Sequence, residues 1–272
     1  MVAGMLKPLV ATLLAIACAL PASGGDSRRL MLTEQSQKDW DAVGRLNIRG
    51  QGQCTATLIA PDLVLTAAHC VANRRTGKIV HPDQVHFLAG FRKGSYSIHG
   101  RVATIRPAKG YFGGGRPTSR DVALVRLRAP GSADLVAPID LADHAGVGQE
   151  VATYSYGRDR SFILSSEPSC HILGREGTRL GTSCEATPGV SGAPLILSTP
   201  DGPRVVGVIA AMTGAKPPLM RGRALSVSVD RTARARLFGT TALEDQAADV
   251  QPARPVLSPL PRPSQDTEPI PA

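Results

Sequence analysis

Thr187-Pro188-Gly189-Val190-Ser191-Gly192-Ala193-Pro194 is the most informative stretch of this chain, because it presents a serine in a glycine-flanked turn. A second segment far upstream, Leu65-Thr66-Ala67-Ala68-His69-Cys70, places a histidine beside a cysteine. Between them, Ser119-Arg120-Asp121-Val122-Ala123-Leu124-Val125 carries an aspartate into an apolar run. A serine, a histidine and an aspartate that meet in space make a nucleophile strong enough to cleave an amide. We therefore take these three residues as candidate catalytic groups.

Each of the three residues also has an ordinary structural interpretation. A serine between glycines is common in turns, and a histidine near a strand end is often structural. An aspartate before an apolar strand often caps a turn. All three occurring together in one chain by chance is improbable, so we prefer the catalytic interpretation.

The composition indicates β structure. The chain has 272 residues, of which 42% are hydrophobic, enough for one or two domains with real cores. Its 28 glycines and 22 prolines indicate many turns, and aromatic residues make up only 4%. The net charge is +9, but the arginines are scattered and no dense basic run alternates with aromatics, so we expect no nucleic-acid partner. Anionic partners, or solubility alone, remain explanations of the charge.

Short apolar runs alternate with turn signals along most of the chain, which is typical of small antiparallel barrels. We predict a first barrel over residues 41–137 and a second over 138–238, which ends in a short helix over 230–238 with Asp230 as its N-cap. The strands predicted for the first barrel are 54–59, 63–65, 84–89, 97–105 and 122–127, and those for the second are 151–155, 169–173, 193–197, 205–211 and 224–229.

The N-terminus has the layout of a secretory signal. Lys7 precedes an apolar run over residues 9–20, and small residues follow at 21–25. The run is too short to span a bilayer comfortably, and the residues before Cys18 fit a lipoprotein signal poorly. We therefore predict a signal peptide over 1–25, a secreted or periplasmic protein, and no stable membrane anchor.

Two further segments flank the predicted barrels. Residues 26–40 are polar and form an N-terminal extension, which the sequence does not identify as a propeptide or as part of the mature protein. Residues 239–272 are rich in proline, which lacks an N–H and fixes φ, so we expect a disordered tail.

The cysteine count agrees with export. Without Cys18, four cysteines remain, and four allow three pairings. Short loops favour Cys54 with Cys70 and Cys170 with Cys184. The chain has no C-x-x-C or H-x-x-x-H pair, so we expect neither a zinc site nor any other cofactor.

The segments 54–70, 121–124 and 189–194 resemble the histidine, aspartate and nucleophile segments of trypsin-like (chymotrypsin-fold) serine proteases, in particular those of the secreted bacterial members. The order His, Asp, Ser is also the order of that family. The resemblance covers about residues 41–238. It implies an all-β fold of two six-stranded antiparallel barrels, and a serine endopeptidase that acts on peptides or proteins, which we expect to be a monomer.

The resemblance also assigns roles. Ser191 Oγ would attack the scissile carbonyl, His69 would take and later return the proton, and Asp121 would hold the imidazole. The backbone N–H groups of Gly189 and Ser191 would bind the oxyanion.

The chain departs from the trypsin pattern at several positions. Val190 stands where trypsin has an aspartate that pairs with a new N-terminus, so we expect the nucleophile turn to be held by other means. Glu185 lies where trypsin has the acidic residue that binds a basic P1 side chain (P1 is the residue before the cleaved bond). The alternative is that Glu185 is an ordinary surface glutamate. Met212 near the pocket wall would favour smaller side chains. Ile209 stands where glutamate-specific members have a histidine. Two other functions remain open, a non-catalytic homologue that serves as a secreted binding module and an esterase with the same triad.

Overall fold

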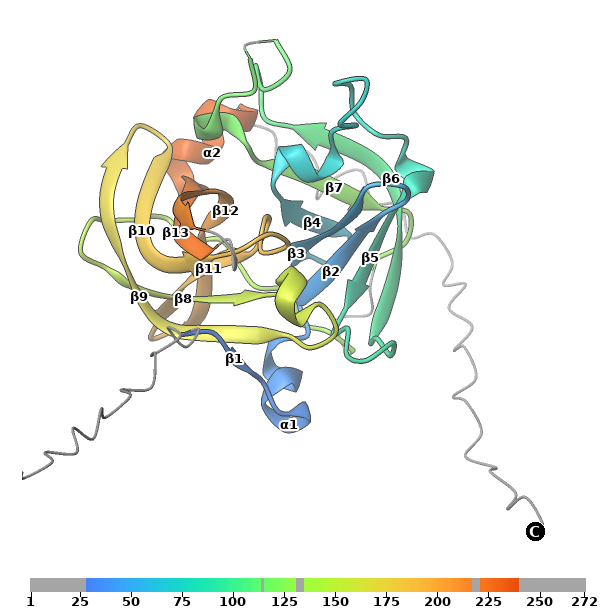
Figure 1. Ribbon diagram of the computed structural model, residues 1–272, viewed down its shortest axis with the longest axis horizontal. Helices are drawn as coiled ribbons and strands as arrows, with labels where there is room; N and C mark the ends of the chain where they lie inside the picture. Colours follow the sequence, from blue (N-terminus) through green and yellow to red (C-terminus); the bar gives the residue numbers. More distant parts are fainter. Residues whose placement is uncertain (1–27, 114, 131–134, 217–220, 240–272) are drawn as a thin grey trace, which may run out of the picture.

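The computed structural model describes residues 28–113, 115–130, 135–216 and 221–239 (Figure 1). Two barrels of antiparallel strands lie side by side in this part of the chain. The predicted signal peptide over 1–25 and nearly all of the predicted tail over 239–272 lie outside the described residues. Within the described ranges, no helix is long and apolar enough to cross a membrane.

The first barrel is closed and follows the strand order β2-β3-β4-β7-β6-β5. Inward-facing aliphatic side chains fill it, with Phe87 as a fully buried aromatic. Five of its six strands agree with the predicted runs to within a few residues, and β2 was missing from the predicted set. They are β2 (Val43–Ile48), β3 (Gly52–Ala60), β4 (Leu63–Thr66), β5 (Val85–Ala89), β6 (Ile98–Pro107) and β7 (Ala123–Leu127).

The second barrel follows the order β8-β9-β10-β13-β12-β11 and closes because β8 pairs with both β9 and β11. The prediction of two six-stranded antiparallel barrels is therefore confirmed. One strand of this barrel, β10, was missing from the predicted set. The strands are β8 (Glu150–Ser155), β9 (Ser165–Glu176), β10 (Arg179–Ala186), β11 (Pro194–Thr199), β12 (Gly202–Lys216) and β13 (Arg221–Ser228).

The polar N-terminal extension is structured where it is described. Its strand β1 (Leu30–Met31) pairs with β9, and helix α1 (Glu34–Gln37) follows with Thr33 as its N-cap. Gln37 is buried, and its side-chain amide donates to the backbone carbonyls of Gly90 and Phe91 in the first barrel. The extension therefore joins the two barrels (Figure 1).

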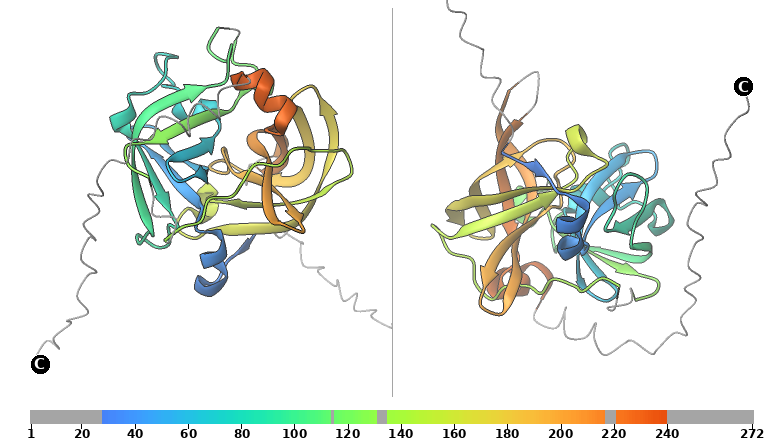
Figure 2. Two further views of the ribbon diagram at one scale, coloured as in Figure 1. Left: turned by 180° about the vertical axis from the view of Figure 1, so that it is seen from behind. Right: turned by 90° about the horizontal axis from the view of Figure 1, so that it is seen from below.

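Helix α2 (Arg231–Phe238) confirms the predicted closing helix. The Asp230 carboxylate accepts a hydrogen bond from the N–H of Ala233 at 2.9 Å, as expected of an N-cap. The end of α2 contacts the first barrel, since the Lys109 N–H donates to the Leu237 carbonyl at 2.8 Å. Figure 2 shows α2 between the two barrels.

Short 3₁₀ helices complete the fold. Three of them lie at the candidate catalytic segments: one contains His69, one ends directly before Asp121, and in one the Arg158 N–H donates to the Pro188 carbonyl. The 3₁₀ helices are η1 (Lys38–Trp40), η2 (Ala68–Val71), η3 (Pro82–Gln84), η4 (Thr118–Arg120) and η5 (Arg158–Arg160).

Candidate active site

The pairing of β4 with β7 brings His69 and Asp121 together. His69 lies in η2, directly after β4, and Asp121 lies between η4 and β7. The two strands pair with Thr66 opposite Ala123, so the histidine and the aspartate extend from neighbouring strand ends. Asp121 is buried, with 7% of its surface exposed.

The Asp121 carboxylate holds His69 at two points. Its Oδ2 lies 2.8 Å from His69 Nδ1, and its Oδ1 accepts the backbone N–H of His69 at 2.8 Å. Because an ionised carboxylate only accepts, Nδ1 carries the proton in this contact. His69 Nε2 is therefore the ring nitrogen that is left for proton transfer. Burial and the nearby Asp121 carboxylate raise the pKa of Tyr111, which keeps that phenol neutral beside the aspartate.

The turn that carries Ser191 is tied to the first barrel through Thr55 on β3. The Thr55 N–H donates to the Ser191 carbonyl at 2.8 Å, and the Thr55 hydroxyl donates to the Gly189 carbonyl at 3.2 Å. Gly192 approaches the same strand so closely that an added Cβ would lie 2.0 Å from the Thr55 oxygen. The contact between the barrels thus sets the position of the serine.

The peptide groups of this turn have a defined orientation. The Pro188 carbonyl accepts the N–H of Arg158 at 2.7 Å, and the Val190 carbonyl accepts the N–H of Ala193 at 2.9 Å. In a trans peptide the N–H points opposite to the carbonyl, so the N–H groups of Gly189 and Ser191 point away from these partners. Neither donates to another residue of the described ranges. Two backbone donors next to the serine are therefore available.

Glycine is required at position 189 for two reasons. Its φ is +95°, in the left-handed region that favours glycine. A Cβ there would lie 2.7 Å from the backbone nitrogen of Arg158 and 2.9 Å from the carbonyl oxygen of Tyr156. Both atoms belong to the backbone, which cannot swing aside.

Val190 is held by apolar packing. Only 2% of its surface is exposed, and it belongs to a buried cluster that includes Cys184, Ala193 and Ile209. This packing, together with the hydrogen bond to the Pro188 carbonyl, explains how the turn is kept without the ion pair used by trypsin.

His69 and Ser191 line one cavity of about 530 Å³. Met212, the predicted wall residue, lines it as well, together with Pro188 and Gly189. The Ser191 hydroxyl makes no hydrogen bond with another described residue. Catalytic hydrogen bonds are often loose before substrate binds, so this geometry is compatible with proton transfer to His69. The remaining lining residues are Arg45, Asn47, Gln51, Gly52, Gln53, Cys54, Arg74, Arg158 and Ser161.

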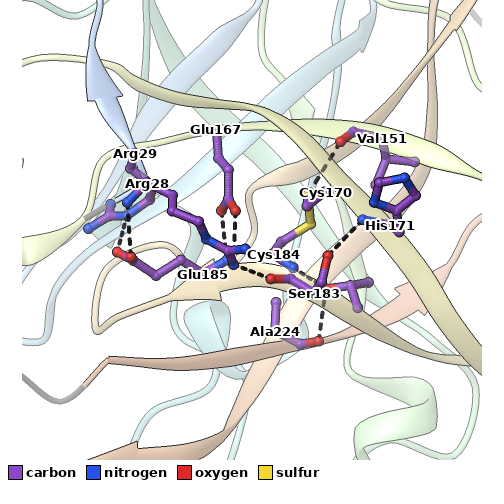
Figure 3. Close-up of polar contacts among 11 residues, drawn as sticks. Arg28, Arg29, Val151, Glu167, Cys170, His171, Ser183, Cys184, Glu185 and Ala224 are labelled. Carbon is purple, nitrogen blue, oxygen red and sulfur yellow. Dashed lines mark hydrogen bonds and ion pairs between the residues drawn. A yellow bond between two sulfur atoms is a disulfide. The ribbon is translucent and has the colours of Figure 1, made fainter. Parts of the chain in front are cut away.

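Glu185 is not among the residues that line this cavity. Its Oε1 lies 3.2 Å from Nε of Arg29, a side chain with no exposed surface, and its Oε2 accepts the backbone N–H of Arg28 at 3.3 Å. Arg28 also pairs with Glu167 at 3.0 Å, and burial is the main cause that raises the pKa of Glu167 (Figure 3). Arg29 makes a second ion pair with Asp159 at 2.6 Å.

This ionic cluster was not predicted from the sequence. Arg29 and Glu185 are separated by 156 residues, and no local pattern connects them. The only available signal was a pair of arginines in an otherwise unassigned extension.

Both predicted disulfides are present, Cys54–Cys70 and Cys170–Cys184. The side chains of Cys54, His69 and Cys70 come within 4.8 Å of one another. The two sulfurs are bonded to each other, so they offer no thiolate to a metal. The first disulfide therefore acts as a wall beside His69, with Cys70 Sγ 3.8 Å from Nε2.

Comparison with known proteins identifies the family. A family model described as Trypsin matches residues 32–229. The structure of a Glu endopeptidase in complex with MPD aligns with a TM-score of 0.66 and 16% identity, covering 82% of this chain and 98% of that one. The structure of the thermostable serine protease AL20 from an extremophilic microorganism aligns with a TM-score of 0.63 and 17% identity, covering 76% and 99%. At these identities the two structures support the fold, and the family match covers most of the chain. The chain therefore belongs to the trypsin family of chymotrypsin-fold serine proteases.

Proposed function

We propose that this protein is a serine endopeptidase in which Ser191, His69 and Asp121 form the catalytic triad. The observation that carries the proposal is the contact of 2.8 Å between His69 Nδ1 and Asp121, since it leaves Nε2 for the cavity that His69 shares with Ser191. A Trypsin family match over residues 32–229 supports the same chemistry.

In the proposed reaction Ser191 Oγ attacks the carbonyl carbon of the scissile bond while His69 Nε2 takes its proton. The tetrahedral intermediate collapses to an acyl-enzyme when the same nitrogen gives that proton to the leaving amine. Water then attacks the acyl group by the reverse sequence of proton transfers. Asp121 holds the ring and stabilises the imidazolium that forms in each step.

The backbone N–H groups of Gly189 and Ser191 would stabilise the negative oxygen of both tetrahedral intermediates. They are preorganised, because the carbonyls on the same two peptide groups are held by the Arg158 and Ala193 N–H groups. Losing one such donor typically costs about 3–4 kcal/mol of transition-state stabilisation.

The P1 preference is a separate part of the proposal. A preference for Arg or Lys would require the Glu185 carboxylate to face the substrate, and its ion pair with the buried Arg29 weighs against that. Met212, in the cavity wall, supports a preference for smaller side chains. Glu185→Gln tests the first idea, since unchanged selectivity between Arg and uncharged P1 residues would refute it.

The two disulfides favour an oxidising compartment, which supports the proposed export to the periplasm or the medium. Mass spectrometry of the N-terminus of the protein recovered outside the cytoplasm tests this point. A protein found only in the cytoplasm with its first residues intact would contradict it.

The test of the proposed activity is hydrolysis of a mixed peptide library by the purified protein. Ser191→Ala is expected to lower turnover by about 10⁶. Ser198→Ala on β11 is the matched control, because Ser198 is exposed and does not line the cavity. Equal turnover by Ser191→Ala and the wild type would reject the triad.

The same assay separates the alternatives. If the protein hydrolyses ester substrates but leaves the peptides uncleaved, it is an esterase. If it binds peptides but turns over neither kind of substrate, it is a non-catalytic homologue.

A further inference from the structure

Three arginines line the cavity that contains His69 and Ser191. They are Arg45, Arg74 and Arg158, and the described lining includes no aspartate or glutamate. None of the three forms an ion pair with a carboxylate in the described ranges. Elsewhere on this protein many arginines have such a partner, for example Arg175 with Asp230 at 2.6 Å. The described lining therefore includes three arginines and no acidic residue to balance them.

Arg45 on β2 has the most side-chain contacts of the three within the described residues. Its Nε donates to Asn47 Oδ1 at 2.7 Å, and its Nη1 donates to the Ser161 carbonyl at 3.3 Å. The guanidinium carbon lies 4.9 Å from the ring centre of Phe91 and 5.7 Å from that of Phe162. Its Nη2 makes no hydrogen bond within the described part of the chain. A half-buried guanidinium held in this way is prepared to bind a carboxylate at little cost in entropy.

The other two arginines are exposed and come from different barrels. Arg74 follows η2 in the first barrel, where its backbone N–H donates to Gln51 Oε1 at 2.8 Å. Arg158 begins η5 in the second barrel, next to the Pro188 carbonyl. Arginines from both barrels thus belong to the lining of the same cavity.

Arg45 lies close to the disulfide beside His69, because it pairs with Thr55, the residue that follows Cys54. The leaving amine must receive its proton from His69 Nε2, which lies 3.8 Å from Cys70 Sγ. Cys70 is bonded to Cys54, and Cys54 pairs with Leu46 on β2, the neighbour of Arg45. A substrate chain that leaves the cleaved bond past this disulfide would run toward β2.

We propose that the cleft selects peptides that carry Asp or Glu at the first or second position after the cleaved bond, with Arg45 as the main specificity residue. Arg74 and Arg158 add to the positive field. This inference rests on the proposed endopeptidase activity and deepens it by naming the substrate class.

The test compares matched peptides that differ only by Glu or Gln. The peptide library identifies a cleaved sequence, and each position from P3 to P3′ is then varied in turn. Wild-type kcat/KM is expected to be about tenfold higher for Glu than for Gln at P1′ or P2′, the size of one charge-assisted hydrogen bond. The preference is expected to weaken between low salt and high salt, because exposed charges are screened.

Variants assign the effect to residues. Arg45→Gln is expected to lower the Glu/Gln ratio of kcat/KM toward one, and Arg45→Lys to keep part of that ratio. Arg74→Gln is expected to reduce it, whereas Arg75→Gln, an exposed neighbour outside the cavity lining, is the charge-matched control and is expected to leave it intact. If Arg45→Gln does not fold, the wild-type Glu/Gln ratio and the Arg74 and Arg158 variants still decide the matter.

Equal cleavage of Glu and Gln peptides at every position after the bond would overturn the inference and leave the endopeptidase proposal standing. An acidic preference found only before the cleaved bond would also overturn it. Cleavage of no peptide at all would refute the endopeptidase proposal, and the inference would fall with it.

Discussion

Replacing Gly192 by alanine tests how the two barrels position the nucleophile. The Gly192 φ is +84°, and a Cβ at this position would lie 2.0 Å from the Thr55 carbonyl oxygen and 2.3 Å from Thr66 Oγ1. Both atoms belong to the first barrel, and the Thr66 hydroxyl is already held by the Thr55 carbonyl at 2.8 Å. The methyl group would therefore push the nucleophile turn away from β3.

The expected cost has two parts. A left-handed backbone costs an alanine about 1–2 kcal/mol relative to glycine. Overpacking a tight contact adds about 1–3 kcal/mol. Together they predict that Gly192→Ala lowers the free energy of unfolding by about 2–5 kcal/mol. Gly50→Ala is the matched control, since Gly50 also has a positive φ of +76° but nothing lies within 4 Å of the added Cβ.

The assay is urea unfolding of both variants beside the wild type, with kcat/KM measured on the same samples. The control is expected to lose only the backbone part, about 1–2 kcal/mol, and to keep its activity. Gly192→Ala is expected to lose more stability and also activity, because the Thr55 N–H bond to the Ser191 carbonyl is displaced. Equal losses in the two variants would refute the reasoning about the barrel contact.

Three further predictions concern stability. Arg29→Met is expected to lower the free energy of unfolding by about 3–5 kcal/mol, because two carboxylates lose a buried counter-charge. Chemical denaturation measures this loss, and a loss of less than about 1 kcal/mol would contradict the stabilising role of the N-terminal extension. The double variant Cys170→Ala/Cys184→Ala opens a loop of 14 residues and is expected to lose about 3 kcal/mol, which calorimetry under matched conditions measures. Asp230→Asn keeps the N-cap but weakens the contact with Arg175, so we expect a loss of about 1.5–3 kcal/mol at neutral pH. Burial acts to raise the pKa of Asp230, but its hydrogen bonds hold that pKa below the ordinary value of 3.8. The difference in stability between Asp230→Asn and the wild type should therefore persist above pH 3.8 and shrink as the pH falls through the pKa of Asp230 in the folded protein. A difference that does not change between neutral and acidic pH would contradict this assignment.

The sequence predicted the fold well because the signals for its strands are local. Strands such as 54–59 and 122–127 are apolar runs between turn residues, and both are found within one or two residues of β3 and β7. The strand β10 was missed because Gly181 and Ser183 interrupt its apolar pattern, and pairing with β9 and β13 overrides that weak local preference.

The candidate site was predicted where the residues belong to recognisable motifs, and not where they meet only in space. His69, Asp121 and Ser191 lie in three such segments. Arg45, Arg74 and Arg158 looked scattered along the chain, and only the meeting of the two barrels gathers them in one cavity. Domain boundaries remain predictions.

Arg29 shows the same limit. An arginine in a polar extension gave no sign of burial, since that depends on β1 pairing with β9 and on two acids more than a hundred residues away. The ionic cluster in turn changes the interpretation of Glu185, which the sequence alone suggested as a substrate contact.

The central claim is that Ser191 is an activated nucleophile. The most direct measurement is to react the purified protein with a fluorophosphonate and to locate the adduct by peptide mass spectrometry. We predict one adduct per molecule on Ser191, which forms rapidly in the native protein and fails to form when the protein is first unfolded in urea. An adduct on any other residue, or no adduct on native protein with intact disulfides, would contradict the account.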